Sequence, residues 1–212
     1  MPSWEPEAKW LDQDVFIIGG GRSLKTFDWD LLIPELTIGC NTAYELGEAI
    51  CKICVFGDIK WWHKHKSHLA EYKGVVFTNT SQLINKNKTP WLWTMRREAH
   101  GLHHNALGWN SNTGSIAINL ALILGAKRIY LLGYDMQLSE GKPNWHDNLI
   151  DKPNAAIYNK FQEGFKKVHI DWQKKFSDRE IINVTDNSNL DTFPKIGTQE
   201  FWNDRNKQRM IA

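Results

Sequence analysis

The chain has 212 residues, and its 26 lysines and arginines against 24 aspartates and glutamates give a net charge of +2 with the histidines neutral. Charged residues make up 24% and apolar residues 42%, which is close to average globular usage and excludes a disordered or low-complexity protein. The small net charge argues against a protein that coats nucleic acid or an acidic membrane surface. The 11 tryptophans favour a ligand cleft in addition to a core.

The absence of a recognisable targeting signal and the usage of cysteine both favour the cytoplasm. The first seven residues carry glutamates where a signal peptide needs basic residues, and the most apolar stretch, 116–124, is too short to span a bilayer. Cys51 and Cys54 form one C-x-x-C pattern, with no second copy to complete a zinc site. Residues i and i+3 of a strand face opposite ways, so we expect free buried thiols in a reducing compartment.

Apolar runs of strand length alternate with longer helical patterns along the chain. The run at 90–93 starts with a proline, which favours a place at the edge of the sheet. Strands are predicted at 15–18, 36–40, 53–56, 74–78, 90–93, 128–132 and 180–184, and helices at 42–50, 59–72, 114–124 and 155–176.

Continuously apolar strands that alternate with helices imply a mostly parallel sheet covered on both faces. We therefore predict an α/β fold, a Rossmann-like three-layer sandwich, with residues 1–212 as one nucleotide-binding domain. Segments 79–108 and 133–154 are long and rich in Asn, His, Trp and Lys, so we expect lid-like loops there.

Ligands of an open parallel sheet bind at the carboxyl ends of its strands, so the residues that follow each strand are candidates for a site. The first strand is followed by Gly19, Gly20, Gly21, Arg22 and Ser23, which we call the glycine turn. Glycines allow backbone N–H groups to approach a phosphate closely, but any tight turn between a strand and a helix also favours glycine. A phosphate contact and a plain turn are both open interpretations.

The second and third strands each end at a polar residue. Asn41 follows the second strand, where its amide is suited to a base or ribose, and Asp58 follows the third. Both residue types are also favoured helix caps, so capping of the predicted helices at 42–50 and 59–72 is the alternative for each.

The strand at 128–132 carries the strongest signal. Asp135 follows it at the same edge of the predicted sheet as the glycine turn and Asn41. The N–H groups at the start of the preceding helix, with hydroxyls beside them, are suited to an anion, and a simple threonine or serine cap is the alternative. Because several polar sites meet at one edge, we expect a nucleotide or phosphorylated ligand there. The helix begins with Asn112, Thr113, Gly114 and Ser115.

The histidines differ in what they indicate. Clusters at 63–68 and 100–104 lack a carboxylate placed to complete a catalytic metal site, so we predict no metal. His146 follows Asp135 in a segment long enough to fold over the carboxyl end of the sheet. A general base is useful there, and a nearby carboxylate can orient its imidazole, while an ordinary loop histidine is the alternative.

Four blocks of the chain resemble the bacterial α-2,3/2,8-sialyltransferases, in which similar blocks occur in the same order. The blocks are residues 18–25 (I-G-G-G-R-S-L-K), Cys40-Asn41, 112–115 (N-T-G-S) and 125–135 (G-A-K-R-I-Y-L-L-G-Y-D). Asn187-Ser188 is similar to that family's N-S pair. Related blocks occur in 6-hydroxymethylpterin diphosphokinase-like (DUF115-type) proteins and in small phage proteins, so the chain also resembles a small phage-type member of this wider group.

The resemblance implies that the glycine turn holds a nucleotide phosphate, that Asn41 contacts the nucleotide, and that residues 113–115 hold its base or ribose. His146 stands where that family has the histidine that deprotonates the acceptor hydroxyl, and Asp135 would position the donor or the lid. The implied activity is that of a metal-independent, inverting glycosyltransferase. It would use a nucleotide-activated sugar, CMP-type first, and a small-molecule or glycan acceptor, with no further cofactor.

Two other functions are open. An ATP-dependent diphosphokinase acting on a hydroxymethyl compound would need Mg²⁺, which Asp58 and Asp135 would hold. A non-catalytic nucleotide-binding protein is the second alternative. EDTA should abolish diphosphokinase activity and spare a sialyltransferase-like enzyme. A membrane span and a nucleic-acid partner are not expected, whereas a homo-oligomer is compatible with the sequence.

Overall fold

A seven-stranded parallel sheet forms the centre of the protein in a computed structural model that describes residues 9–84, 89–146 and 154–211. Its strand order is β5-β4-β3-β2-β1-β8-β9, and a second sheet pairs the short strands β6 and β7. The strands are β1 (Asp14–Ile18), β2 (Leu36–Cys40), β3 (Ile53–Phe56), β4 (Val75–Thr78), β5 (Leu92–Thr94), β6 (Arg97–Glu98), β7 (Leu107–Gly108), β8 (Arg128–Leu132) and β9 (Glu180–Asn183).

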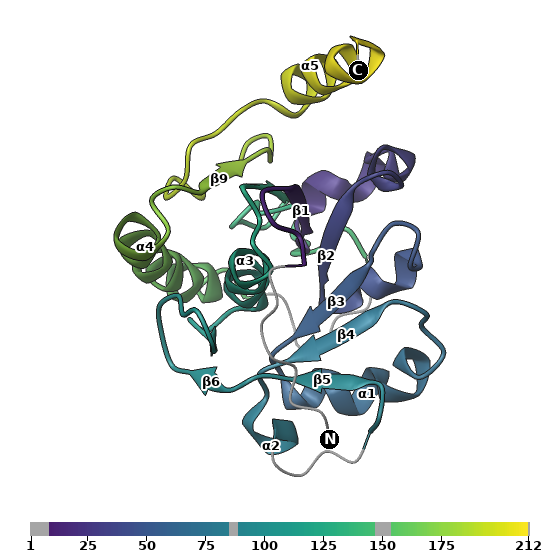
Figure 1. Cartoon of the computed structure of the whole chain (residues 1–212), viewed down its shortest axis with the longest axis vertical. Helices are drawn as coiled ribbons and strands as arrows, with labels where there is room; N and C mark the ends of the chain where they lie inside the picture. Colours follow the sequence, from purple (N-terminus) through teal and green to yellow (C-terminus); the bar gives the residue numbers. More distant parts are fainter. Residues whose placement is uncertain (1–8, 85–88, 147–153, 212) are drawn as a thin grey trace.

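Helices cover both faces of the sheet, so the fold is the predicted Rossmann-like three-layer sandwich (Figure 1). Because side chains alternate along a strand, Val15 and Ile17 pack with α3 and α4, while Phe16 and Ile18 pack on the face that carries α1 and α5. The helices are α1 (Ile59–Leu69), α2 (Ser81–Ile84), α3 (Thr113–Ile123), α4 (Ile157–Lys175) and α5 (Thr198–Ile211), with 3-10 helices η1 (Arg22–Thr26), η2 (Trp29–Leu32) and η3 (Asn41–Leu46).

The chain changes direction across the sheet at β1. It runs outward from β1 through β2, β3 and β4 to β5, and it then returns to β8 on the other side of β1. The register places Ile18 opposite both Gly39 of β2 and Leu132 of β8, so these strands end level with one another. A switch point of this kind leaves a crevice outside the carboxyl ends of the strands. The loops after β1 and β8 are therefore placed to form a site.

Most predicted elements are confirmed, and the differences are local. The predicted helix at 42–50 is wrong: η3 covers only Asn41–Leu46, because Gly47 turns the chain away with φ of +80°. The proline-headed strand is confirmed at the sheet edge as β5. Within the described residues, no helix is both long and apolar enough to cross a membrane.

All three cysteines are free and buried, as expected. Cys51 and Cys54 nevertheless lie in the same core cluster rather than on opposite faces, because Cys51 precedes β3 and does not follow the alternation of that strand. Burial raises the pKa of the Cys40 thiol to about 12 and that of the Cys51 thiol to about 11, so both stay protonated at neutral pH.

The C-terminal helix α5, which the sequence analysis does not predict, is fixed to the sheet by an aromatic contact and an ion-pair network. Trp202 stacks on Phe16 of β1 with 5.4 Å between ring centroids. Arg205 donates to both carboxylate oxygens of Glu35, at 2.8 and 2.6 Å, and to Asp14 at 2.8 Å. Glu35 is only 6% exposed, so its charge depends on these partners.

We expect Arg205→Ala to lower the free energy of unfolding by about 3 kcal/mol, because it removes a partner from the buried charge of Glu35. Arg209 also pairs with Glu35 and limits the loss. Urea unfolding followed by circular dichroism measures the change. The control is Lys207→Ala, which removes an exposed ion pair on the same helix and should cost less than about 0.5 kcal/mol. Equal stabilities of the two variants would contradict the prediction.

Candidate functional site

A cleft of about 480 Å³ opens at the carboxyl ends of the strands, between the loops that follow β1 and β8. The first turns of α3 and α4 form further walls, and the size is typical of a small-molecule or cofactor site. Residues from separate segments of the chain thus meet at one place. Nine of the predicted site residues line the cleft: Gly19, Gly20, Gly21, Asn41, Asp58, Asn112, Thr113, Gly114 and Asp135.

Three predicted residues are not among those that line the cleft: Ser23, Ser115 and His146. Ser23 lines a second groove. Ser115 is fully buried, and its backbone N–H donates to the side chain of Asn112 at 2.7 Å. His146 is half-buried, and its ring lies edge-on to that of Trp145 with 5.0 Å between centroids.

The glycine turn is held by hydrogen bonds to the loop after β8. The N–H groups of Gly19 and Gly21 donate to the carbonyl oxygens of Leu132 and Gly133 at 2.7 and 2.8 Å. A Cβ at Gly21 would lie 2.0 Å from Oδ1 of Asp135, so the two loops approach as only glycine allows. Because these two N–H groups already donate to carbonyls of the protein, they are not free to bind a phosphate, and their hydrogen bonds are those of a plain turn.

Asp135 joins the two loops through its side chain. It is 5% exposed, and its carboxylate accepts hydrogen bonds from the backbone N–H and the hydroxyl of Ser23 at 2.8 and 2.6 Å. Each carboxylate oxygen therefore has a partner in the first turn of η1. Asp135 holds the glycine turn against the end of β8.

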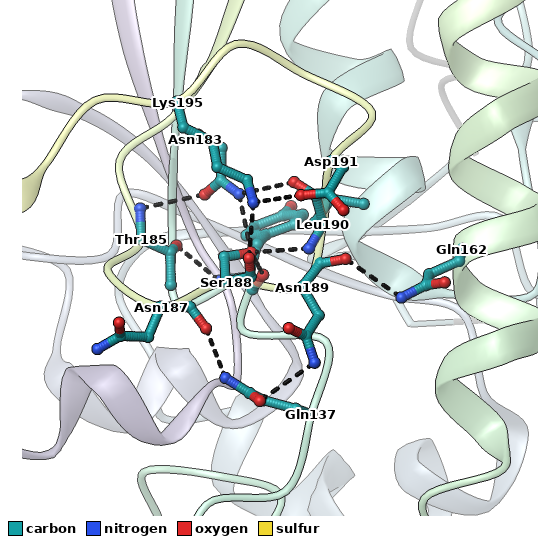
Figure 2. Close-up of polar contacts among 11 residues, drawn as sticks. Gln137, Gln162, Asn183, Thr185, Asn187, Ser188, Asn189, Leu190, Asp191 and Lys195 are labelled. Carbon is teal, nitrogen blue, oxygen red and sulfur yellow. Dashed lines mark hydrogen bonds and ion pairs between the residues drawn. The ribbon is translucent and has the colours of Figure 1, made fainter.

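A polar network from β9 and the turn after it fixes the loop that carries Asp135 (Figure 2). The Ser188 hydroxyl donates to the carbonyl of Tyr134 at 2.6 Å and accepts from Nδ2 of Asn183 at 2.9 Å. The backbone N–H of Asn189 donates to the carbonyl of Asp135 at 2.9 Å. Sequence reasoning noted Ser188 as part of an N-S pair, but not that it supports this loop.

The capping interpretation is confirmed for Asp58, whose Oδ1 accepts from the N–H of Lys60 at 2.7 Å to cap α1. It is wrong for Asn41, which is not the cap of η3, and α3 is capped by the side chain of Asn112 instead of by a threonine or serine. Asn41 is different, because it starts η3 with φ of +52° and accepts a hydrogen bond from the Thr113 hydroxyl at 3.3 Å. These residues also line the cleft, so capping does not remove them from the site.

Two tryptophans that sequence reasoning did not assign to the site, Trp61 and Trp109, line the cleft. The guanidinium of Arg97 lies 4.3 Å from the Trp109 ring centroid, and a Cβ at Gly57 would lie 2.3 Å from the same ring. Trp61 stacks on the buried ring of His65 at 4.5 Å. Both indoles are thus held in place, but Trp61 is only 3% exposed, so the half-buried Trp109 is the ring with apolar surface free for a base.

The first turn of α4 adds Tyr158, Lys160 and Phe161 to the cleft. Burial, followed by the charge of Asp135, raises the pKa of Tyr158, so its hydroxyl stays protonated and able to donate. Val168 of the predicted apolar stripe packs in the core, and Phe161, nearer the start of the helix, both packs against that core and lines the cleft. The apolar spacing of this helix indicates burial, but it does not indicate which residues of the helix line a cleft.

The described part of the segment after β8 returns to the glycine turn and is held against it by Trp145. Trp145 donates through its backbone N–H and its indole Nε1 to two carbonyls of the turn, at 2.9 and 3.2 Å. Pro143 and Asn144 line the cleft, whereas none of the described residues of 79–108, the other expected lid, does so. Residues 147–153, part of the predicted lid, lie outside the described residues.

The histidine clusters make local contacts. A ring nitrogen of His103 lies 2.8 Å from the carbonyl of His100, and the ring of His104 packs on Phe176. Among the described residues, no group of three His, Cys, Asp or Glu side chains is placed to hold a metal ion.

The parallel sheet, its switch point and the cleft define a Rossmann-like α/β protein. No protein-family model and no curated protein sequence matches the chain. The structure is similar to that of the sialyltransferase CstII from Campylobacter jejuni, which was solved in complex with a substrate analogue, cytidine-5'-monophosphate. The TM-score is 0.53 at 16% sequence identity, and the match covers 88% of this chain and 85% of that one. The chain therefore has a sialyltransferase-like fold.

We expect Gly21→Ala to lower the melting temperature. The new Cβ would lie 2.0 Å from Oδ1 of Asp135 and 2.6 Å from the carbonyl of Gly133, so backbone must shift, at a cost of about 1–3 kcal/mol. Differential scanning fluorimetry measures the change. Gly197→Ala is the matched control, because its Cβ would meet no described atom closer than 3.8 Å. A melting temperature equal to that of the control would show that the turn tolerates a side chain.

Proposed function

We propose that the protein is a glycosyltransferase that binds a nucleotide-activated sugar of the CMP type in the cleft and transfers the sugar to a hydroxyl acceptor. One observation carries the proposal: nine residues predicted from the sequence to form a nucleotide site line a single cleft. A second observation supports the choice of nucleotide, since the sialyltransferase with the similar fold was solved with cytidine-5'-monophosphate.

The first turns of α3 and α4 are suited to the phosphate of the donor. Thr113 and Gly114 of α3 and Tyr158 and Lys160 of α4 line the same cleft. Helix N-termini carry a partial positive charge, and lysine adds a full one. In our proposal these groups hold the phosphate. The N–H groups of Gly19 and Gly21 already donate within the protein, so the glycine turn contacts the ligand without donating these two hydrogen bonds.

The asparagines and Trp109 of the cleft are suited to the nucleoside. Trp109 offers an aromatic surface for a base, and Asn41 and Asn112 offer amide groups for a base edge or a ribose hydroxyl. Thr113 hydrogen bonds to Asn41, which links this part of the site to the phosphate part. The sugar would then lie toward the lid-like loop.

The transfer in this proposal is a single displacement. The acceptor oxygen forms a bond to the anomeric carbon, the bond from that carbon to the phosphate oxygen breaks, and the nucleotide leaves with the electron pair. The acceptor proton passes to His146, which does not line the cleft but lies two residues after Asn144 of its wall, so its imidazole must turn toward the cleft when the acceptor binds. The positive groups at the first turns of α3 and α4 stabilise the charge that develops on the leaving phosphate.

We expect CMP to bind the protein, and Lys160→Met to weaken that binding by about 10-fold while cytidine binding stays unchanged. The reason is that the variant removes a positive charge near the proposed phosphate position and leaves the nucleoside walls intact; a 10-fold loss corresponds to about 1.4 kcal/mol. Isothermal titration calorimetry with CMP and cytidine measures both affinities.

Lys166→Met is the matched control for the charge. Lys166 lies on the same helix, is exposed and pairs with Glu163, so its loss should change neither affinity. Tighter binding of ATP with Mg²⁺ than of CMP would favour the diphosphokinase alternative. The absence of any nucleotide binding would contradict the proposed function as a whole.

We expect His146→Ala to reduce sugar transfer by about 10²–10⁴-fold with CMP affinity retained, because general-base catalysis contributes on that order. A radiometric transfer assay with a donor shown to bind, run alongside calorimetry, separates the two effects. His68→Ala, which removes an exposed histidine near the end of α1, is the control and should transfer at the wild-type rate. Wild-type transfer by His146→Ala would remove this residue from the mechanism.

A further inference from the structure

A second groove, of about 350 Å³, lies on the other side of the glycine turn from the cleft. Gly133 lines both hollows, but the remaining walls of the groove come from η1, η2, the turn after β9 and helix α5. The function proposed for the cleft uses none of these walls.

Helix α5 presents a stripe of carboxamides to the groove. Gln199, Asn203 and Asn206 are spaced four and three residues apart, which places them on one face of the helix, and all three line the groove. Nε2 of Gln199 donates to Oδ1 of Asn203 at 3.0 Å. The side-chain NH₂ group of Asn203 can therefore donate to another partner. Carboxamides both donate and accept hydrogen bonds, so the stripe suits a ligand whose groups do the same.

The charges of the groove disfavour anions. Asp28 and Asp186 line it, and none of its lining residues in the described part of the chain is a lysine or arginine. Asp186 accepts a hydrogen bond from the N–H of Thr198 at 3.0 Å, and Asp28 accepts one from the N–H of Asp30 at 3.2 Å, so both carboxylates already have a partner within the protein. With two carboxylates and no lysine or arginine among its described lining residues, the groove favours an uncharged polar ligand over phosphates and nucleotides.

Trp202 adds an aromatic wall with an unused donor. The residue is 5% exposed and lines the groove, and its buried Nε1 has no hydrogen-bond acceptor among the described residues. A buried N–H without an acceptor is destabilising, and a ligand hydroxyl reaches this N–H if the Trp202 side chain shifts toward the groove. Phe27, whose ring centroid lies 6.0 Å from that of Trp202, adds apolar surface.

We propose that this groove binds a neutral saccharide unit. A pyranose ring offers hydroxyls that donate and accept, which match the carboxamide stripe and the carboxylates, and apolar C–H faces, which match the rings of Phe27 and Trp202. The volume has room for about one or two sugar rings. This inference goes beyond the function proposed for the cleft and does not depend on it.

The test is an NMR titration of the full chain, labelled with ¹⁵N, in which the indole N–H signal of Trp202 is the readout. The probes are maltotriose, cellotriose and N,N′,N″-triacetylchitotriose as neutral saccharides, with glucose 6-phosphate and spermidine as charged competitors. We expect at least one neutral saccharide to shift the Trp202 signal saturably, and CMP to leave it unchanged. The absence of a shift with all three saccharides would overturn the proposal, as would a stronger response to either charged compound.

The variant that tests the stripe combines Asn203→Ala with Asn206→Ala. It removes two carboxamides from the groove and should weaken saccharide binding by at least about 10-fold. Gln208→Ala is the matched control, because it removes an exposed carboxamide of the same helix that does not line the groove. Equal affinity of the double variant and the control would overturn the proposal, while CMP affinity, unchanged in both, reports separately on the cleft.

Discussion

The pair of hydrogen bonds from Ser23 to Asp135 is the contact on which the site depends. It joins the loops after β1 and β8, the two strands between which the chain reverses across the sheet. A buried carboxylate is stable only when its oxygens have partners, and charge-assisted hydrogen bonds are the strongest partners available. Gly21 lets the loops approach, and Ser188 holds the Asp135 loop from the other side. The walls of the cleft are thus fixed before any ligand arrives.

The cleft and the groove are each lined by two aspartates and differ in their other groups. The cleft gathers helix N-termini, Lys160 and two tryptophans, which suit an anion attached to an aromatic base. The groove gathers carboxamides and carboxylates, which suit an uncharged hydroxyl-rich ligand. A nucleotide and a neutral saccharide would therefore not compete for the same walls. If the protein is a glycosyltransferase, a saccharide in the groove would be a part of the acceptor that lies away from the hydroxyl to which the sugar is transferred.

Capping and ligand binding are not alternatives in this fold, although they compete as interpretations of the sequence. Asp58 and Asn112 each cap a helix and each line the cleft. The reason is geometric: a helix that follows the carboxyl end of a parallel strand starts at the edge where ligands bind, so its capping residue lies there as well. A capping side chain uses one oxygen to accept a hydrogen bond from a helix N–H group, and its remaining polar atoms can still contact a ligand.

Apolar periodicity and strand-end chemistry are local properties, so the sequence predicts the seven strands of the main sheet, its three layers and the polar residues that follow each strand, but not β6 and β7. The strand order, the partner of Asp135 and the side chains of α4 that line the cleft depend on the tertiary structure. Trp61, Trp109 and Lys160 could not be assigned to the site from their neighbours in sequence, and α5 has too few apolar residues to show a period. A local pattern reports that a residue is buried or exposed, whereas only the packing of distant segments decides what it meets.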